Sequence, residues 1–343
     1  MKKTLLTLIL TGVLLSSCNN NDSSEAQNTS SKDLSSDTQS SSLVKEYQKS
    51  DLSIISPTGA PALAFYNYAT LSSFETNSDP KNITAMMAAG QKDVIVLPTN
   101  AGVQTIINKQ AEYKIAATIT FGNFYIVSLN NDDNNVMDAT DTILLFQEKN
   151  VPDKLFHYIY GDELNPAIHY VNAVSDAASA IIGRKFVDAE TGNNLVPNYV
   201  MIAEPALTTV KTKLATSSQS ADQITVYANI QEEYKKKSSN LEIFQASVFI
   251  KNNVDKSLGE SFLNSLEREI GQAINDSSKL SEGMSKATNP NELFGVAPNV
   301  AASVMSNNNG MGLGFKFARD NKDAIANFLS IFSINNIDEK IYF

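Results

Sequence analysis

Cysteine, histidine and tryptophan are scarce in this sequence of 343 residues, which has one cysteine, two histidines and no tryptophan. A single cysteine excludes a disulfide within the chain. His157 falls inside an expected helix and His169 inside an expected strand, so no histidine–cysteine cluster of the kind that holds zinc is expected. The sequence also lacks a GxSxG nucleophile elbow, an HExxH motif and a Walker phosphate loop. These gaps argue against an enzyme, and we expect no cofactor and no bound metal.

Basic residues are also in the minority, with 27 Lys and Arg against 37 Asp and Glu and a net charge of −10. An acidic surface repels nucleic acid and anionic lipid headgroups. The short basic run at residues 235–237 follows Glu232 and Glu233 and is interpreted as a solvated helix face. We therefore expect no nucleic-acid partner.

The N-terminus has the three parts of a secretion signal: two lysines, the apolar run Leu5 to Leu15, and small residues before Cys18. The run is too short to cross a bilayer, which takes about 20 helical residues. Residues 1–17 are therefore predicted to be a removed signal peptide. Leu15-Ser16-Ser17-Cys18 resembles the lipobox of bacterial lipoproteins, in which the cysteine carries diacylglycerol. We expect lipid on Cys18, with an ordinary signal cleaved nearby as the alternative.

Residues 18–50 are predicted to be the lipidated cysteine followed by a disordered tether. Asn, Ser, Asp, Thr and Gln dominate this segment, and Leu34 is its only large apolar residue before Leu43. Such a segment buries too little surface to offset the entropy of ordering. The chain would then be held by lipid alone on the extracytoplasmic face of the bacterial cell membrane.

Residues 51–343 alternate strand-like and helix-like segments, which favours an α/β fold with parallel-rich sheets flanked by helices. Strands are expected at residues 53–55, 93–97, 115–119, 124–128, 142–146, 168–171, 199–202, 224–227 and 244–250. Helices are expected at residues 62–71, 83–89, 152–160, 175–182, 206–214 and 231–237, and over almost all of 254–334. The glycine-rich run 307–314 follows a helix and is expected to be a loop between C-terminal helices.

Ligands of open α/β sheets bind beyond the carboxyl ends of strands, near helix N-termini with unpaired N–H groups. The clearest such loop starts at Ser56, where two prolines stiffen the chain and Gly59 allows close approach of the backbone. Ser56 and Thr58 offer hydroxyls that either bind a ligand or cap a helix. The candidate ligand-binding residues in this loop are Ser56, Thr58, Gly59 and Ala60.

Two further loops in the first half of the chain follow the same logic. Thr99 and Asn100 come after a buried strand, where they either cap a helix or bind ligand. Gly122 and Tyr125 lie at a turn that we expect at the rim of a crevice.

Candidates in the second half also lie where strands end. Gln147 ends a strand, and Asn172 and Ser175 join a strand to a helix that Ser175 is expected to cap. Asp176 would favour the helix dipole there and repel an anionic ligand. Glu204 is interpreted as a cap or hinge residue, with a contact to a cationic ligand group as the alternative.

Four segments, in this order, resemble the nitrate/sulfonate/taurine (SsuA-like) group of ABC-importer solute-binding proteins. They are residues 56–62, 122–128, 199–206 and 245–250, and the likeness spans residues 50–335. The resemblance implies a two-lobed type II periplasmic-binding-protein-like fold with two crossing segments, a ligand in the cleft between the lobes and a helical C-terminal region.

Residues 51–128 and 245–343 would then form lobe 1 and residues 129–244 lobe 2, with hinges near Ser128 and Phe244. The resemblance implies a monomer that delivers a small-molecule ligand to an ABC permease and its ATPase. Helix N-termini and hydroxyls favour an anionic solute, whereas the lack of arginine in the loops favours a neutral heterocycle. A synthase or transferase on the same fold and a non-transport surface lipoprotein are the alternatives. Related synthases use cysteines and histidines that this chain lacks.

Overall fold

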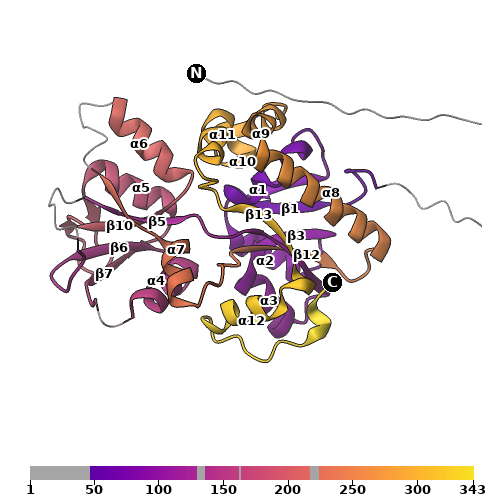
Figure 1. Ribbon diagram of the computed structural model, residues 1–343, viewed down its shortest axis with the longest axis horizontal. Coiled ribbons are helices and arrows are strands. Elements are labelled where there is room, and N and C mark those ends of the chain that lie inside the picture. The colour runs from indigo at the N-terminus through magenta and orange to yellow at the C-terminus, as the bar shows by residue number, and fades with distance from the viewer. Residues whose placement is uncertain (1–46, 130–135, 162–163, 217–223) are drawn as a thin grey trace, which may run out of the picture. The chain divides into compact units, whose positions relative to one another are not determined.

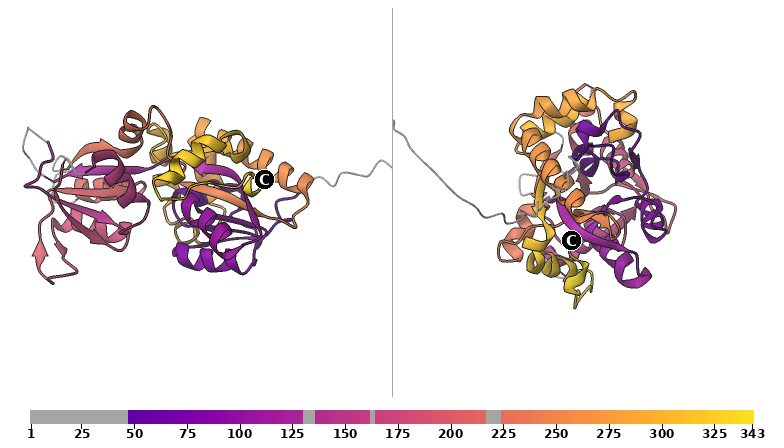
Figure 2. Two further views of the ribbon diagram at one scale, coloured as in Figure 1. Left: turned by 90° about the horizontal axis from the view of Figure 1, so that it is seen from below. Right: turned by 90° about the vertical axis from the view of Figure 1, so that its right-hand side faces the viewer.

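The computed structural model describes residues 47–129, 136–161, 164–216 and 224–343, which contain two large β-sheets covered by helices (Figures 1 and 2). The predicted signal peptide and Cys18 lie outside the described residues, as does the tether up to residue 46. No helix in the described part of the chain is both long and apolar enough to span a membrane.

The first sheet has six strands in the order β13-β4-β12-β3-β1-β2. Strands β1, β2 and β3 are parallel, β12 is antiparallel to both β3 and β4, and β13 is antiparallel to β4. The bounds are β1 (Ile54–Pro57), β2 (Phe74–Asn77), β3 (Val94–Pro98), β4 (Tyr113–Thr120), β12 (Ala246–Lys251) and β13 (Leu313–Phe317).

Strand β3 shows why this sheet needs helices on both faces. Val94 and Val96 pack into one hydrophobic cluster, while Ile95 and Leu97 pack into another. Successive side chains of a strand point to opposite faces, so an unbroken apolar run must be covered twice. One face carries α2 (Pro80–Ala88), α3 (Thr99–Lys109) and α12 (Lys322–Ser330). The other carries α1 (Ala60–Leu63), α8 (Lys256–Asn275), α9 (Ser277–Met284), α10 (Pro290–Phe294) and α11 (Pro298–Ser306).

The second sheet has five strands in the order β11-β5-β10-β6-β7. Strand β6 is parallel to β7 and β10, whereas β5 is antiparallel to β10 and β11. The strands are β5 (Phe124–Ser128), β6 (Thr142–Phe146), β7 (Ala167–Val171), β10 (Tyr199–Ala203) and β11 (Thr225–Asn229). A small hairpin is formed by β8 (Phe186–Val187) and β9 (Asn194–Leu195).

Helices cover both faces of the second sheet too (Figure 1). Leu144 and Val200 pack against α5 (Val174–Gly183) and α6 (Ala206–Thr216). Ile143 and Met201 belong to the cluster that contains the apolar residues of α4 (Val151–Tyr160) and α7 (Ile230–Lys237). Short 3₁₀ turns complete the described elements: η1 (Tyr66–Tyr68), η3 (Ala318–Asp320) and η4 (Glu339–Ile341). This mixed architecture confirms the predicted α/β class.

One strand lies in a different sheet from the one the sequence suggested. Residues 124–128 were expected to close the first lobe, but β5 pairs with β10 from Tyr199↔Ser128 to Ala203↔Phe124. Its apolar residues are buried there, Ile126 and Val127 on opposite faces of the second sheet. The chain therefore crosses between the sheets before β5, at residues 121–123, and placing that crossing near Ser128 was wrong. The other lobe boundaries stay a prediction.

The C-terminal region is also less helical than expected. The glycine-rich run leads into strand β13, which pairs with β4, so reading the run as a loop between helices was wrong. Leu313, Phe315 and Phe317 all pack into the hydrophobic cluster on one face of the first sheet, which is the two-residue period of a strand. The expected helix at 62–71 is likewise broken, into α1 and η1.

Close packing between α3 and β12 makes a prediction about stability. A Cβ atom at Gly102 in α3 would lie 2.1 Å from the Phe249 ring, whereas one at Gly271 in α8 meets no atom within 4 Å. Because overpacking a core costs about 1–3 kcal/mol, Gly102→Ala is expected to lower the free energy of unfolding by that amount. Gly271→Ala is expected to raise it by about 0.5–1 kcal/mol, since alanine favours helix.

Urea unfolding followed by circular dichroism measures both variants. A Gly102→Ala protein as stable as the parent would contradict the packing of α3 on β12.

Candidate functional site

A cavity of about 590 Å³ lies where the carboxyl ends of strands from both sheets meet the crossing segments. Strands β1, β3, β6 and β10 all end at it, through Pro57, Pro98, Phe146 and Ala203. The other lining residues are Thr58, Gly59, Ala60, Pro61, Ser78, Pro80, Asn123, Phe124, Gln147, Val151, Pro152, Ala173, Val174, Ser175, Ala178, Ile182, Glu204, Pro205, Ala206, Thr209, Val210, Lys213, Gln245, Ala246 and Gly295. This is the position at which α/β folds bind ligands.

The loop after β1 is held in place by a second loop. The Gly59 N–H donates to the carbonyl of Phe294, the last residue of α10, over 2.9 Å. Gly295 then turns with a φ of +71°, and a Cβ there would lie 3.1 Å from both the Gly59 nitrogen and the Thr58 Cβ. Glycine at 295 is therefore required for the close approach that positions Thr58 and Gly59 at the cavity.

Asn123 joins the crossing segments at the base of the site. Its side chain is 5% exposed. Its Nδ2 donates to the Glu204 carbonyl over 2.7 Å, and its Oδ1 accepts from Gln245 Nε2 over 3.0 Å. Asn123 lies in the first crossing and Gln245 in the second, while Glu204 follows β10. One amide therefore links three segments that line the cavity.

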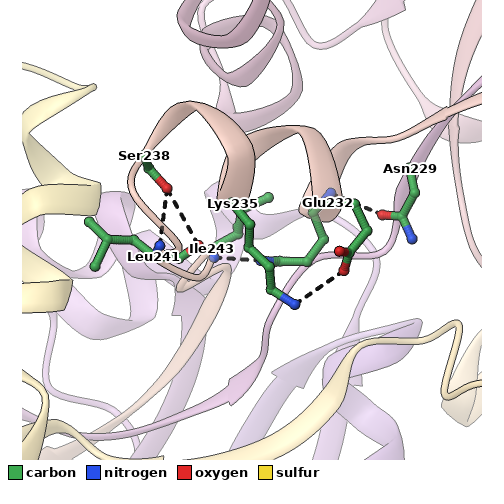
Figure 3. A network of polar contacts seen from close by, with 7 residues as sticks. Asn229, Glu232, Lys235, Ser238, Leu241 and Ile243 are labelled. Carbon is green, nitrogen blue, oxygen red and sulfur yellow. Dashed lines mark hydrogen bonds and ion pairs between the residues drawn. The ribbon is translucent and has the colours of Figure 1, made fainter.

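A second network fixes the return crossing against α7 (Figure 3). Gln231 Oε1 accepts from the Ile243 N–H over 3.2 Å, and the Gln231 N–H donates to Asn229 Oδ1 over 3.0 Å. Gly122 lies beside this network, with a φ of +98°, and a Cβ there would lie 2.8 Å from Gln231 Oε1. Gly122 therefore lets the two crossings pass close to each other, and it does not line the cavity.

Glu204 is a buried acid just before the N-terminus of α6. Its carboxylate accepts from the Thr208 N–H and from Thr208 Oγ1, each over 2.9 Å, so it caps the helix as the sequence suggested. Burial raises the pKa of this carboxyl, against the lowering effect of the bonds from Thr208 and the charge of Lys211. The charge of Glu204 is thus already directed at the helix N-terminus.

Half of the residues predicted from sequence line the cavity. They are Thr58, Gly59, Ala60, Gln147, Ser175 and Glu204. The sequence did not single out Asn123, Gln245, Thr209 and Lys213, which also line it. Asn123 and Gln245 could have been found from their place in the two segments that run between the sheets.

The other predicted residues lie outside the lining. Ser56 is buried and its hydroxyl donates to the Pro57 carbonyl, while Thr99 Oγ1 lies 2.7 Å from Ser247 Oγ. Asn100 is 7% exposed and its side-chain oxygen has no hydrogen-bond partner among the described residues. Asn172 is exposed, and Tyr125 is half-buried in β5. Contact of these residues and of Gly122 with a ligand stays a prediction.

The cap of α5 differs from the one expected. The helix begins at Val174, so Ser175 lies within its first turn instead of before it, and the prediction that Ser175 caps the helix was wrong. The Asp176 carboxylate instead reaches back and accepts from the Ala173 N–H over 3.0 Å. An acid at the third helical position can do this because it faces the N-cap residue.

Both histidines are paired with aspartates away from the cavity lining. His157 Nε2 lies 3.2 Å from Asp153, and His169 Nδ1 lies 2.7 Å from Asp188. Within the described ranges, no three His, Cys, Asp or Glu side chains gather closely enough to hold a metal ion.

No family model and no curated protein matches this chain. Several solved structures do. An ABC transporter structure from Parabacteroides distasonis is 16% identical with a TM-score of 0.61, over 82% of this chain and 91% of that one. The periplasmic aliphatic sulphonate binding protein SsuA from Escherichia coli is 9% identical with a TM-score of 0.56, over 82% and 86% of the two chains.

A third structure is the ligand binding component of an ABC-type import system from Staphylococcus aureus, solved with zinc bound. It is 10% identical with a TM-score of 0.54, over 84% of this chain and 94% of that one. These likenesses establish the fold, which is that of periplasmic-binding proteins, and they confirm the predicted SsuA-like architecture.

The raised pKa of Glu204 predicts how stability depends on pH. The folded protein keeps this proton to a higher pH than the unfolded chain, so the group's contribution to the free energy of unfolding falls as pH rises above the ordinary value of 4.5. Glu204→Gln removes that dependence. The Tm of the variant relative to the parent is therefore expected to rise between pH 4.5 and the raised pKa.

Scanning calorimetry of both proteins in steps from pH 4 to pH 7 provides the measurement. A relative Tm that falls over this interval would show that the carboxylate form is the one the fold favours.

Proposed function

We propose that this protein is an extracytoplasmic solute-binding lipoprotein of an ABC importer. It captures a small molecule in the cavity at the carboxyl ends of the strands and delivers it to the permease, which an ATPase drives. The observation that carries the proposal is the composition of the lining. The lining includes Thr58 and Gly59 beside the first sheet, and Gln147 and Ser175 beside the second. Asn123 and Gln245 come from the two crossings between the sheets.

Such a lining couples binding to a change of shape. A ligand that touches the loops of both sheets gains most contacts when they close on it, so binding favours the closed state. The crossings at residues 121–123 and near Phe244 are the places for a hinge, because few segments connect the two sheets there. In this proposal each lobe is built on one sheet, and the monomer is the functional unit.

Three further observations support a binding protein over an enzyme. The solved structures with this fold include a sulphonate binding protein and the ligand binding component of an importer. Each of the two histidines contacts an aspartate, and both pairs lie outside the cavity lining. Glu204, the only acid among the described residues of that lining, is held by Thr208 as a helix cap.

The proposed anchor suits this role. Lipid on Cys18 and the polar residues that follow it would keep the receptor close to its permease. The chain joins the folded part at Tyr47, whose hydroxyl lies 2.8 Å from that of Tyr68, and at Lys49, whose ammonium lies 2.8 Å from the buried Glu269. Tyr47 and Lys49 therefore hold the start of the described chain beside η1 and α8.

Blocking the cavity tests the proposal directly. Ala178 lines the cavity from α5, while its neighbour Ser179 is exposed and lies outside the lining. Ala178→Phe should fill the space and reduce occupancy by the co-purifying small molecule by about tenfold or more, because overpacking displaces ligand contacts. Ser179→Phe, the matched control, should keep the molecule.

Native mass spectrometry of the full chain, purified without refolding, measures occupancy in the parent and both variants. Equal occupancy in Ala178→Phe and the parent would place any bound solute elsewhere.

Replacing the lipidation site tests the anchor. Cys18→Ser should move the protein from the membrane fraction to the soluble extracytoplasmic fraction, because no thiol is left to acylate. Cell fractionation with immunoblotting measures the distribution. Full retention of the variant on the membrane would reject lipid at Cys18 as the anchor.

A further inference from the structure

We infer that the solute is uncharged, with a largely apolar body that carries an N–H or O–H donor. This inference rests on the proposed function and narrows the substrate class of the same cavity. It departs from an anionic solute, which helix N-termini and hydroxyls alone would favour.

The helix N-termini at the cavity already face carboxylates of the chain itself. Asp79 accepts from the Lys81 N–H at α2 over 2.9 Å, Asp176 from the Ala173 N–H at α5 over 3.0 Å, and Glu204 from the Thr208 N–H at α6 over 2.9 Å. At α4, Asp153 is 4% exposed and accepts from the Lys149 N–H over 2.8 Å. Each carboxylate offsets the positive end of its helix and repels a second anion.

Two further N–H groups beside the cavity are bonded to carbonyls of the chain. The Gly59 N–H before α1 donates to the Phe294 carbonyl over 2.9 Å, and the Thr99 N–H of α3 donates to the Gln245 carbonyl over 3.0 Å. Proline stands at one of the first two positions of α1, α2 and α4, where it supplies no N–H. The Gly59 and Thr99 N–H groups are therefore not available to an anion, and the prolines remove one further donor from each of α1, α2 and α4.

Basic side chains add little positive charge to the cavity. Lys213 is the only basic residue in the described lining, and it is exposed in the last turn of α6. It lies about 10 Å along the helix axis from Ala206. The three arginines are engaged elsewhere: Arg184 donates to the Leu129 carbonyl, Arg268 donates to Ser265 Oγ, and Arg319 pairs with Glu260.

The rest of the lining suits a neutral molecule. Proline, alanine, valine and isoleucine side chains make up most of the wall, and the Phe124 and Phe146 rings meet edge to face at 5.8 Å. Gln147 and Gln245 line the cavity with amide side chains, which recognise uncharged polar groups, whereas the Asn123 amide is already bonded to Glu204 and Gln245. Gln245 lines the cavity, and its side-chain oxygen is buried without a hydrogen-bond partner among the described residues, which leaves one acceptor to be satisfied by a donor.

Three probes that share a ring and differ in charge test the inference: benzamide, benzoate and benzylammonium. Binding to the full chain is measured by titration calorimetry and by the shift in Tm. Benzamide should bind more tightly than either ion by about tenfold or more, because burying an unpaired ion forfeits its hydration.

The outcomes separate this inference from the proposed function. Tighter binding of benzoate or benzylammonium would overturn the uncharged class while leaving a solute receptor in place. No binding by any of the three probes would overturn the uncharged aromatic-amide class for this cavity, while the occupancy of Ala178→Phe still decides the proposed function.

Uncapping α5 tests the physical cause. Asp176→Asn should raise the affinity for benzoate by about two- to fivefold, since an acid in the first turn of a helix contributes interaction of that size. Asp276→Asn is the control, because Asp276 caps α9 by accepting from the Ser278 N–H and lies outside the cavity lining. An unchanged benzoate affinity in Asp176→Asn would remove the caps as the reason for excluding anions.

Discussion

The amide of Asn123 is the contact on which the site depends. It donates to the Glu204 carbonyl and accepts from Gln245, and it is almost fully buried. Buried amides of this kind contribute about 1 kcal/mol per hydrogen bond, and breaking one leaves a partner unsatisfied at greater cost. Because the three residues belong to the two crossings and to the β10–α6 turn, this contact sets the distance between the loops of the two sheets. A hinge motion at the crossings must keep or rearrange it.

The proposed charge class of the solute follows from how the chain caps its own helices. A periplasmic-binding fold brings several helix N-termini to one cavity, which is a ready arrangement for an anion. In this chain the acids Asp79, Asp153, Asp176 and Glu204 occupy those termini. Under the proposal, these acids would make the same fold favour an uncharged ligand over a sulfonate.

Much of the architecture could be predicted from local patterns. Strand β3 reads as an unbroken apolar run, and its burial on both faces explains that pattern. Strand β13 escaped prediction because it follows a glycine-rich run and only every second residue packs inward. The sheet that β5 joins is a matter of long-range pairing, which no short pattern around residues 124–128 encodes.

Residues that line the candidate cavity were predicted where a loop had one strong local signal, as at Thr58 and Gly59. They were missed where the signal depends on partners far along the chain. Asn123 and Gln245 are 122 residues apart in sequence, and only the fold brings their amides together. Ser175 and Asp176 show how far a sequence pattern can locate a helix cap. Either residue could cap α5, and the exact start of the helix decides which one does.

A crystal structure of the full chain purified without refolding would test the central claim most directly. The account predicts density for one uncharged small molecule between Thr58 and Ser175, with a donor directed at the side-chain oxygen of Gln245. A cavity that holds only water, or a sulfonate or carboxylate seated on the N-terminus of α5, would contradict it.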